Sequence, residues 1–353
     1  MKKRFLALSL ALAMCLAMLT GCGGGNDAAT DDGGSTDDAA PGTPEVTWVA
    51  SCANADDHPA VQGVHKFAEL VEEKSGGRMH IDVFANAQLA SDRDCIEGMQ
   101  MNTIQSGIMV SSALAGFTDE LLVFDLPFLF ENSAQGQAVC DSDVGQQILG
   151  TLEDIGIKGL GWMEYGMRNI TNSVRPIEKP EDLQGIKIRT MENQNHMAFW
   201  SALGAAPTPL AWAEVFIALQ NGTIDAHENA ADTVLGANIQ EVQKYLACTN
   251  HILYANQLSM NKEKYDSLDP AYQEAINQAV AEAIEEMKSQ MVESDETNKQ
   301  TLVDGGMTLI EYDDAFFQEI LALDTVQALY DKIDADVNGL GTTLQEELAA
   351  AQG

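Results

Sequence analysis

Arg189 is the side chain in this sequence whose type and position best suit the binding of an anion. Its guanidinium offers two parallel N–H donors that match the two oxygens of a carboxylate, and charge strengthens such hydrogen bonds. The amide of Asn229 can donate to the same carboxylate. Alternating apolar and basic residues predict a short strand over Ile186–Thr190, with Arg189 near its carboxyl end. Periodicity alone favours a plainer interpretation, a solvated arginine on an edge strand.

No catalytic motif accompanies these residues. His227-Glu228 lacks the second histidine of an H-E-x-x-H zinc site, and the sequence contains no P-loop, G-x-S-x-G or G-x-G-x-x-G motif. Residues 259–262 fit S-x-x-K, but the partner motifs S-D-N and K-T-G are missing. We therefore expect no catalytic residues, no cofactor and no metal site, and we do not expect an enzyme.

Two helices and a second strand must position Arg189 and Asn229. The pattern predicts the helices over Asn195–Leu203 and Trp212–Gln220, with Gly204 and Gly222 just beyond the two ends. The second strand is predicted over Thr223–Ala226, shortly before Asn229. Ligands of open α/β sheets lie beyond the carboxyl ends of the strands, which is where this pattern places Arg189 and Asn229.

The same stretch resembles a known family. Residues 187–229 contain the run K-I-R…G-A-x-P-T-P-x-A-W-x-E-V-F-x-A-L-Q-x-G-T-I-D…E-N. This run, long and ungapped, is similar to the substrate-binding proteins of TRAP transporters (tripartite ATP-independent periplasmic carriers), DctP type. The sequence departs from the family pattern at Ala226, where glycine is common, and at Ala230, where proline is common.

The resemblance implies an α/β, two-lobe, periplasmic-binding-protein-like fold with a hinge and a long helix spanning both lobes. We expect that helix to begin at Asp269-Pro270 and to reach about Leu302. Lobe 1 is expected at residues 45–165 and 255–295, and lobe 2 at residues 166–254 and 296–351. Periodicity further predicts a strand over Ile108–Ser112, a helix over Asn238–Tyr245 and a returning strand over Leu253–Met260.

The resemblance also assigns site residues in the second lobe. Arg189 aligns with the ligand-clasping arginine of the family, and Arg168 with an arginine that lines the cleft. Trp212 matches the aromatic residue that covers the ligand, although it could equally be core at the start of a helix. Glu192, three residues after Arg189, could bind that guanidinium or a polar group of the ligand.

Closing contacts from the first lobe are expected from His58, Asp92 and Ser111, each of which could instead be a capping or surface residue. The negative net charge of −35 does not exclude an anionic ligand. Surface charges more than about 8 Å away are largely screened at physiological salt, whereas two arginines inside a closed cleft act at contact distance.

The N-terminus has the features of an exported lipoprotein. Residues 1–21 form a signal peptide, with Lys2, Lys3 and Arg4 before the apolar run Phe5–Leu19. Leu-Thr-Gly-Cys at its end resembles a bacterial lipobox, so Cys22 is the predicted lipidation site; an incidental cysteine is the alternative. Residues 22–44, rich in Gly, Asp, Ala, Ser and Thr, form a flexible tether. The protein is then anchored at the extracytoplasmic face of the membrane or in the periplasm.

Charge and cysteine content limit the possible partners. A net charge of −35 excludes nucleic acid, which requires a basic face. Four cysteines remain after the signal and the lipobox, without C-x-x-C spacing, and both disulfides and free thiols stay open for them: Cys52, Cys95, Cys140 and Cys248.

The sequence thus predicts a binding lipoprotein that captures a small organic anion and delivers it to the membrane permease of a TRAP transporter. A binding protein of an ABC importer or of a sensor system is the nearest alternative. An exported enzyme on the same scaffold and a structural surface lipoprotein are more distant ones. The identity of the anion, the first-lobe contacts and the oligomeric state are left open.

Overall fold

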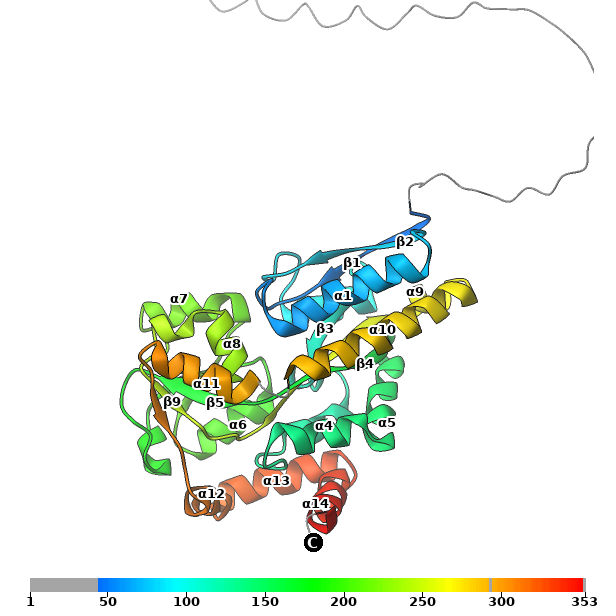
Figure 1. Cartoon of the computed structure of the whole chain (residues 1–353). Coiled ribbons are helices and arrows are strands. Elements are labelled where there is room, and N and C mark those ends of the chain that lie inside the picture. The colour runs from blue at the N-terminus through cyan, green and yellow to red at the C-terminus, as the bar shows by residue number, and fades with distance from the viewer. Residues whose placement is uncertain (1–43, 292–293, 352–353) are drawn as a thin grey trace, which may run out of the picture. The chain divides into compact units, whose positions relative to one another are not determined.

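Two separate β-sheets organise residues 44–291 and 294–351, the part of the chain that the computed structural model describes (Figure 1). The signal peptide, Cys22 and nearly all of the predicted tether lie outside these residues. The first sheet has the strand order β2-β1-β3-β10-β4, formed by β1 (Val46–Ser51), β2 (Met79–Phe84), β3 (Ser106–Val110), β4 (Ile157–Met167) and β10 (Leu253–Asn261). The second has the order β11-β9-β5-β8-β6-β7, formed by β5 (Asn169–Asn172), β6 (Lys187–Thr190), β7 (Ala206–Pro209), β8 (Ala226–Asn229), β9 (Tyr245–Ala247) and β11 (Thr308–Ile310).

The first sheet combines parallel and antiparallel pairing. β1 pairs in parallel with β2 and β3, whereas β10 runs antiparallel to both β3 and β4. Every residue of β10 is buried, as expected for a strand covered on both faces. The elements around this sheet are α1 (Pro59–Lys74), α2 (Asp92–Gln100), α3 (Ser111–Leu114), η1 (Asp119–Asp125), α4 (Ser133–Asp141), α5 (Asp143–Thr151), η2 (Leu152–Ile155), α9 (Lys262–Asp266) and α10 (Pro270–Met291).

Local sequence explains where α1 begins. Pro59 occupies its first turn, where the missing N–H is not needed, and the ring of His58 caps the helix by accepting from the Ala60 N–H. Val64, Phe67 and Val71 form its buried face. α1 packs along α10, which also covers β4, and Figure 1 shows the two helices side by side.

The second sheet places β6 in its interior, between β7 and β8. The carboxyl end of β6 carries Arg189, which is 3% exposed, so the interpretation of a solvated edge-strand arginine is wrong. The remaining helices are η3 (Pro180–Leu183), α6 (Gln194–Ala202), η4 (Trp212–Glu214), α7 (Val215–Gln220), α8 (Ala231–Gly236), η5 (Ile239–Glu241), α11 (Ser294–Asp304), α12 (Asp314–Leu321), α13 (Asp324–Asp336) and α14 (Leu340–Ala351).

The chain passes between the sheets at two adjacent points. It leaves β4 for β5 at Arg168, and it returns to β10 through His251 and Ile252. The Arg168 N–H donates to the Ile252 carbonyl at 2.9 Å, and the His251 N–H donates to the Arg168 carbonyl at 3.2 Å. Along the chain after β10, α10 packs on α1 and β4, whereas α11 packs on α8 beside the second sheet.

Several sequence-based element predictions were wrong. The helix predicted over Asn238–Tyr245 is a short 3-10 turn followed by β9, because Tyr245–Ala247 pairs with β5 and β11. The strand expected to end at Ser112 stops at Val110, and Ser111 begins α3. The strand predicted over Thr223–Ala226 lies at Ala226–Asn229. The predicted long helix is not among these errors, since the described residues of its range form α10 and α11.

The described cysteines Cys52, Cys95, Cys140 and Cys248 are all buried free thiols. Burial raises the pKa of each thiol, which keeps these side chains protonated and unreactive near neutral pH. Within the described ranges, no helix has the length and apolar character required to cross a bilayer.

Candidate functional site

A cavity with a volume of about 30 Å³ lies between the carboxyl end of β6 and the first sheet. Five of the residues singled out in the sequence line it: Asp92, Arg168, Arg189, Trp212 and Asn229. Its other lining residues are Ala53, Asn54, Ala60, Ile108, Val110, Met191, Tyr254 and Asn256. The cavity therefore combines two guanidinium groups with amide, phenol, carboxyl and apolar side chains.

Arg189 has no carboxylate partner among the described residues. Its Nε and Nη2 both donate to the Leu210 carbonyl, at 2.9 and 2.7 Å. Nη1 therefore remains available to donate a hydrogen bond to a ligand in the cavity. Burial, and to a smaller extent the charge of Arg168, lower the pKa of Arg189 to about 10 against the attraction of Glu228. A buried cation with so few acceptors favours an anion beside it.

The indole of Trp212 covers this guanidinium. The central carbon of Arg189 lies 5.7 Å from the indole ring centroid, within the range of a cation–π contact. On another side the indole lies 6.0 Å from the His227 ring. Burial, and then the charge of Arg189, lower the pKa of His227 to about 3, so His227 is neutral.

Arg168 differs from Arg189 because a buried glutamate neutralises it. Its Nε donates to Glu228 Oε2, and its Nη2 donates to Glu228 Oε1 at 2.9 Å and to the Glu228 carbonyl at 2.7 Å. Both side chains are 0% exposed. Although burial raises the pKa of Glu228, the charge of Arg168 and hydrogen bonds from His251 and Arg168 hold it well below its usual range. The pair is thus ionised with no net charge.

Asn229 is oriented by this pair. Its amide oxygen accepts from Arg168 Nη1 at 3.0 Å and from the Ala230 N–H at 3.0 Å. The amide nitrogen is therefore the group that Asn229 can present to a ligand. Arg189 Nη1, Arg168 and Asn229 Nδ2 together supply donors to one side of the cavity.

The opposite side comes from first-sheet elements and carries acceptors as well as donors. Asp92, the first residue of α2, is half-buried there. Burial raises the pKa of Asp92, and the charges of Arg189 and Arg168 oppose that rise. The side chains of Asn54 and Tyr254 are joined by a hydrogen bond of 3.2 Å. The wall facing the arginines thus has no cation among the described lining residues.

Comparison with known proteins agrees with this geometry. Residues 50–336 match the profile of the bacterial extracellular solute-binding proteins, family 7, DctP. The chain belongs to this family. It is 33% identical over 240 residues to the 2,3-diketo-L-gulonate-binding periplasmic protein YiaO of Escherichia coli (strain K12), covering 68% of this chain and 72% of that protein.

Two solved structures show the same fold. A TRAP periplasmic solute-binding protein from Sulfitobacter sp. NAS-14.1 with bound β-D-galacturonate has a TM-score of 0.79 and 30% identity, covering 85% of this DctP-family chain and 98% of that one. One from Shewanella oneidensis with bound succinate has a TM-score of 0.81 and 29% identity, covering 88% and 100%. The predicted TRAP family and two-lobe α/β fold are confirmed.

Three predicted site residues of this DctP-family protein do not line the cavity of about 30 Å³ that contains Arg189. Glu192 is exposed and lines a smaller neighbouring cavity of about 20 Å³ that also reaches Arg189 and Trp212. Ser111 is buried at the start of α3. His58 caps α1 and lies behind the cavity wall, where its ring nitrogen Nε2 is 2.9 Å from the amide of Asn54.

Glu228 and His251 were not selected as site residues from the sequence. Glu228 appeared only as part of an incomplete zinc motif, although it directly precedes the predicted Asn229. Its partner Arg168 lies on the far side of the antiparallel β5–β8 pair, so the contact depends on sheet topology. A glutamate directly before the predicted Asn229, together with the Arg168 that the resemblance selected, is the signal that could have suggested the pair.

Hydrogen bonds also join first-sheet elements to second-sheet elements around the site. Asn193, the N-cap of α6, donates to the Ser112 carbonyl at 2.9 Å and to Asp125 Oδ2 at 2.8 Å. His58 Nε2 lies 3.2 Å from Thr233 Oγ1 on α8. The two sides are therefore in contact around the cavity. Its volume of about 30 Å³ is smaller than an organic acid of several carbons requires.

Proposed function

We propose that this protein is an extracytoplasmic lipoprotein that binds a small organic acid and delivers it to a TRAP-type permease, with no catalytic role. The observation that carries the proposal is the buried guanidinium of Arg189, which faces the cavity without a carboxylate partner. A ligand carboxylate would supply the missing partner through a charge-assisted hydrogen bond. The family supports this role, since relatives bind diketogulonate, galacturonate and succinate.

The charges of the site favour a ligand with one carboxylate and several hydroxyl groups. The ion pair of Arg168 with Glu228 is neutral, so Arg189 alone offers an uncompensated positive charge. Asp92 lies on the opposite wall, where a second carboxylate would lie beside another acidic group and find no cation among the described lining residues. Asn54, Tyr254 and Asp92 suit hydroxyl groups, which both donate and accept.

Ligand entry requires the two lobes to separate. The cavity of about 30 Å³ is too small to admit such an acid as it stands, and hydrogen bonds close it from both sheets. The chain passes between the two sheets at Arg168 and at Ile252, and these two adjacent segments form the hinge. Bending there moves one sheet relative to the other. Ligand would then shift an open population to the closed one.

The proposed ligand class predicts a selective thermal shift. Aldonates and uronates should raise the melting temperature of the mature protein more than succinate does, because a ligand that binds only the folded state stabilises it. Asp92→Asn should reverse part of this preference, weakening hydroxy acids and strengthening succinate, each by about tenfold, which is about 1.4 kcal/mol. Thermal-shift screening followed by calorimetry measures both.

Asp94→Asn is the matched control, because Asp94 is an exposed carboxylate in the same helical turn. It should leave both affinities unchanged. A succinate preference in the wild type would contradict the role of Asp92. Absence of any stabilising organic acid would contradict the proposed function. X-ray scattering of the same samples should show a smaller radius of gyration with ligand, and an unchanged radius would contradict closure.

The lipid anchor predicts that Cys22 carries acyl chains in the cell. Its support is the lipobox placed directly after the apolar run of the signal peptide. Mass spectrometry of the membrane fraction should find a lipidated N-terminus at Cys22, and Cys22→Ser should move the protein into the soluble fraction. A mature N-terminus elsewhere would rule out this anchor while leaving ligand binding unaffected.

A further inference from the structure

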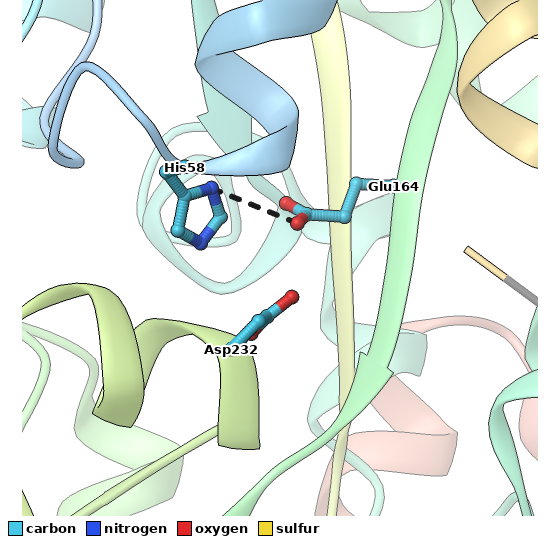
Figure 2. Close-up of side chains that lie close together, drawn as sticks. All are labelled: His58, Glu164 and Asp232. Atoms are coloured by element: carbon cyan, nitrogen blue, oxygen red, sulfur yellow. Dashed lines mark ion pairs between the residues drawn. The ribbon is translucent and has the colours of Figure 1, made fainter. Parts of the chain in front are cut away.

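A second group of ionisable side chains lies behind the cavity wall, where His58, Glu164 and Asp232 face one another (Figure 2). One donor atom of each lies within 4.8 Å of the other two. His58 begins α1 and Glu164 lies on β4 of the first sheet, whereas Asp232 lies on α8, which follows β8 of the second. The group therefore bridges the two lobes.

Two acceptor atoms in this group face each other without a hydrogen between them. His58 Nδ1 accepts from the Ala60 N–H at 3.3 Å, so it carries a lone pair. It lies 3.7 Å from Glu164 Oε1, a buried atom with no hydrogen-bond donor among the described residues. His58 and Glu164 are 2% and 0% exposed, so bulk water does not solvate these atoms. A buried acceptor in this position needs a proton or a cation.

The two carboxyl groups add to this requirement. Burial, and then the adjacent Asp232, raise the pKa of Glu164 well above its usual range. A carboxylate oxygen of Asp232 also lies within 4.8 Å of the Glu164 carboxylate, so the two acidic groups face the same space. A divalent cation would neutralise both carboxylates at once and would satisfy the unpartnered Glu164 Oε1; its bond to His58 Nδ1 would replace the 3.3 Å hydrogen bond from the Ala60 N–H.

We propose that His58, Glu164 and Asp232 form a binding site for a divalent transition-metal cation, with Zn²⁺ the best match. One imidazole and two carboxylates are donors that zinc accepts, and three protein ligands leave a fourth position for water. Zinc ligands lie about 2.0–2.2 Å from the ion, so each donor needs to move inward by less than about 1 Å. No sequence motif marks this site, because its three residues are far apart along the chain.

Metal binding at this site would favour lobe closure, since the donors come from both lobes. The site is also connected to the cavity wall. Asn256 lines the cavity and donates to Glu164 Oε2, and Asn54 lines the cavity beside His58 Nε2. Zinc and the cavity ligand should therefore raise each other's affinity by the same factor. The proposal of a metal site stands independently of the function proposed for the cavity.

The test is titration of the metal-free mature protein with Zn²⁺ at pH 7, by calorimetry and by thermal shift. We expect one high-affinity site, at micromolar Kd or tighter, and a higher melting temperature with the metal. Glu164→Gln and Asp232→Asn should each weaken that site by at least tenfold. His80→Ala is the control, because His80 lies beside Glu72 and Asp82 on the surface and could bind zinc adventitiously; it should leave the high-affinity site intact.

A second readout guards against variants that fold poorly. Visible absorption of the Co²⁺-loaded wild type should show bands of a tetrahedral site, and these should disappear in Glu164→Gln when its circular dichroism matches wild type. The proposal is overturned if the wild type binds no Zn²⁺ at micromolar concentration, or if Glu164→Gln binds it as tightly. It is also overturned if His80→Ala alone removes binding, which would identify a surface site. If His58, Glu164 and Asp232 are stabilised only by protonation, the wild type will bind no Zn²⁺ at micromolar concentration.

Discussion

Arg189→Ala is expected to weaken binding of the organic acid by at least tenfold, about 1.4 kcal/mol. A hydrogen bond to a charged group contributes about 1.5–3 kcal/mol, and Arg189 is the only cation lining the cavity, among the described residues, that lacks a carboxylate partner. The loss should appear in calorimetry with the best ligand from the thermal-shift screen.

The melting temperature of Arg189→Ala without ligand should stay near that of the wild type, because two effects oppose each other. The change removes both donors to the Leu210 carbonyl, which is destabilising. It also removes a buried cation whose pKa is lowered to about 10 by burial, which is stabilising because burial disfavours the charged form.

Arg189→Lys separates charge from geometry. The ammonium keeps the positive charge but lacks the planar guanidinium that can donate to Leu210 and to a ligand at the same time. It should therefore lose most of the affinity. Lys187→Ala is the control, since Lys187 lies on the same strand but is exposed and pairs with Asp225. Full affinity in Arg189→Lys would show that charge alone suffices, and full affinity in Arg189→Ala would move the site elsewhere.

The sequence predicted those parts of the site that depend on residues close together along the chain. Arg189, Trp212 and Asn229 belong to one continuous stretch, and the strand and helices predicted around them occur in the structure with small shifts. Periodicity could not decide whether Arg189 is buried, since that depends on β7 and β8 flanking β6. The family resemblance supplied that answer, and it also selected Arg168.

The errors have a common physical cause, which is pairing between distant segments. Residues 238–245 have a helical apolar pattern, but β9 forms there because β5 and β11 offer backbone partners. Glu228 was not selected because its role depends on Arg168, across the β5–β8 pair. The strand predicted to end at Ser112 stops at Val110, and Ser111 is buried where α3 begins.

The largest effect on stability is expected at Glu228. Glu228→Ala leaves the Arg168 guanidinium buried with no counter-ion, and breaking a buried pair in this way costs about 3–5 kcal/mol. His251 also loses its acceptor, Glu228 Oε2 at 3.2 Å. Chemical denaturation of the metal-free and ligand-free protein should show a loss of this size. Glu241→Gln, an exposed carboxylate change in the second lobe, is the control and should be nearly neutral.

The pH dependence of the free energy of unfolding tests whether Glu228 is ionised in the folded protein. Because Arg168 and the hydrogen bonds hold the pKa of Glu228 well below its usual range despite burial, the ionised carboxylate stabilises the folded state above the unfolded pKa of about 4.3. That contribution is lost as the pH falls through the lower folded-state pKa. The difference in unfolding free energy between wild type and Glu228→Gln should therefore be constant from pH 7 to about 5 and shrink below about pH 4. A difference that grows on acidification would mean that Glu228 is protonated in the folded protein, and the neutral Arg168–Glu228 pair on which the single-carboxylate ligand depends would be wrong.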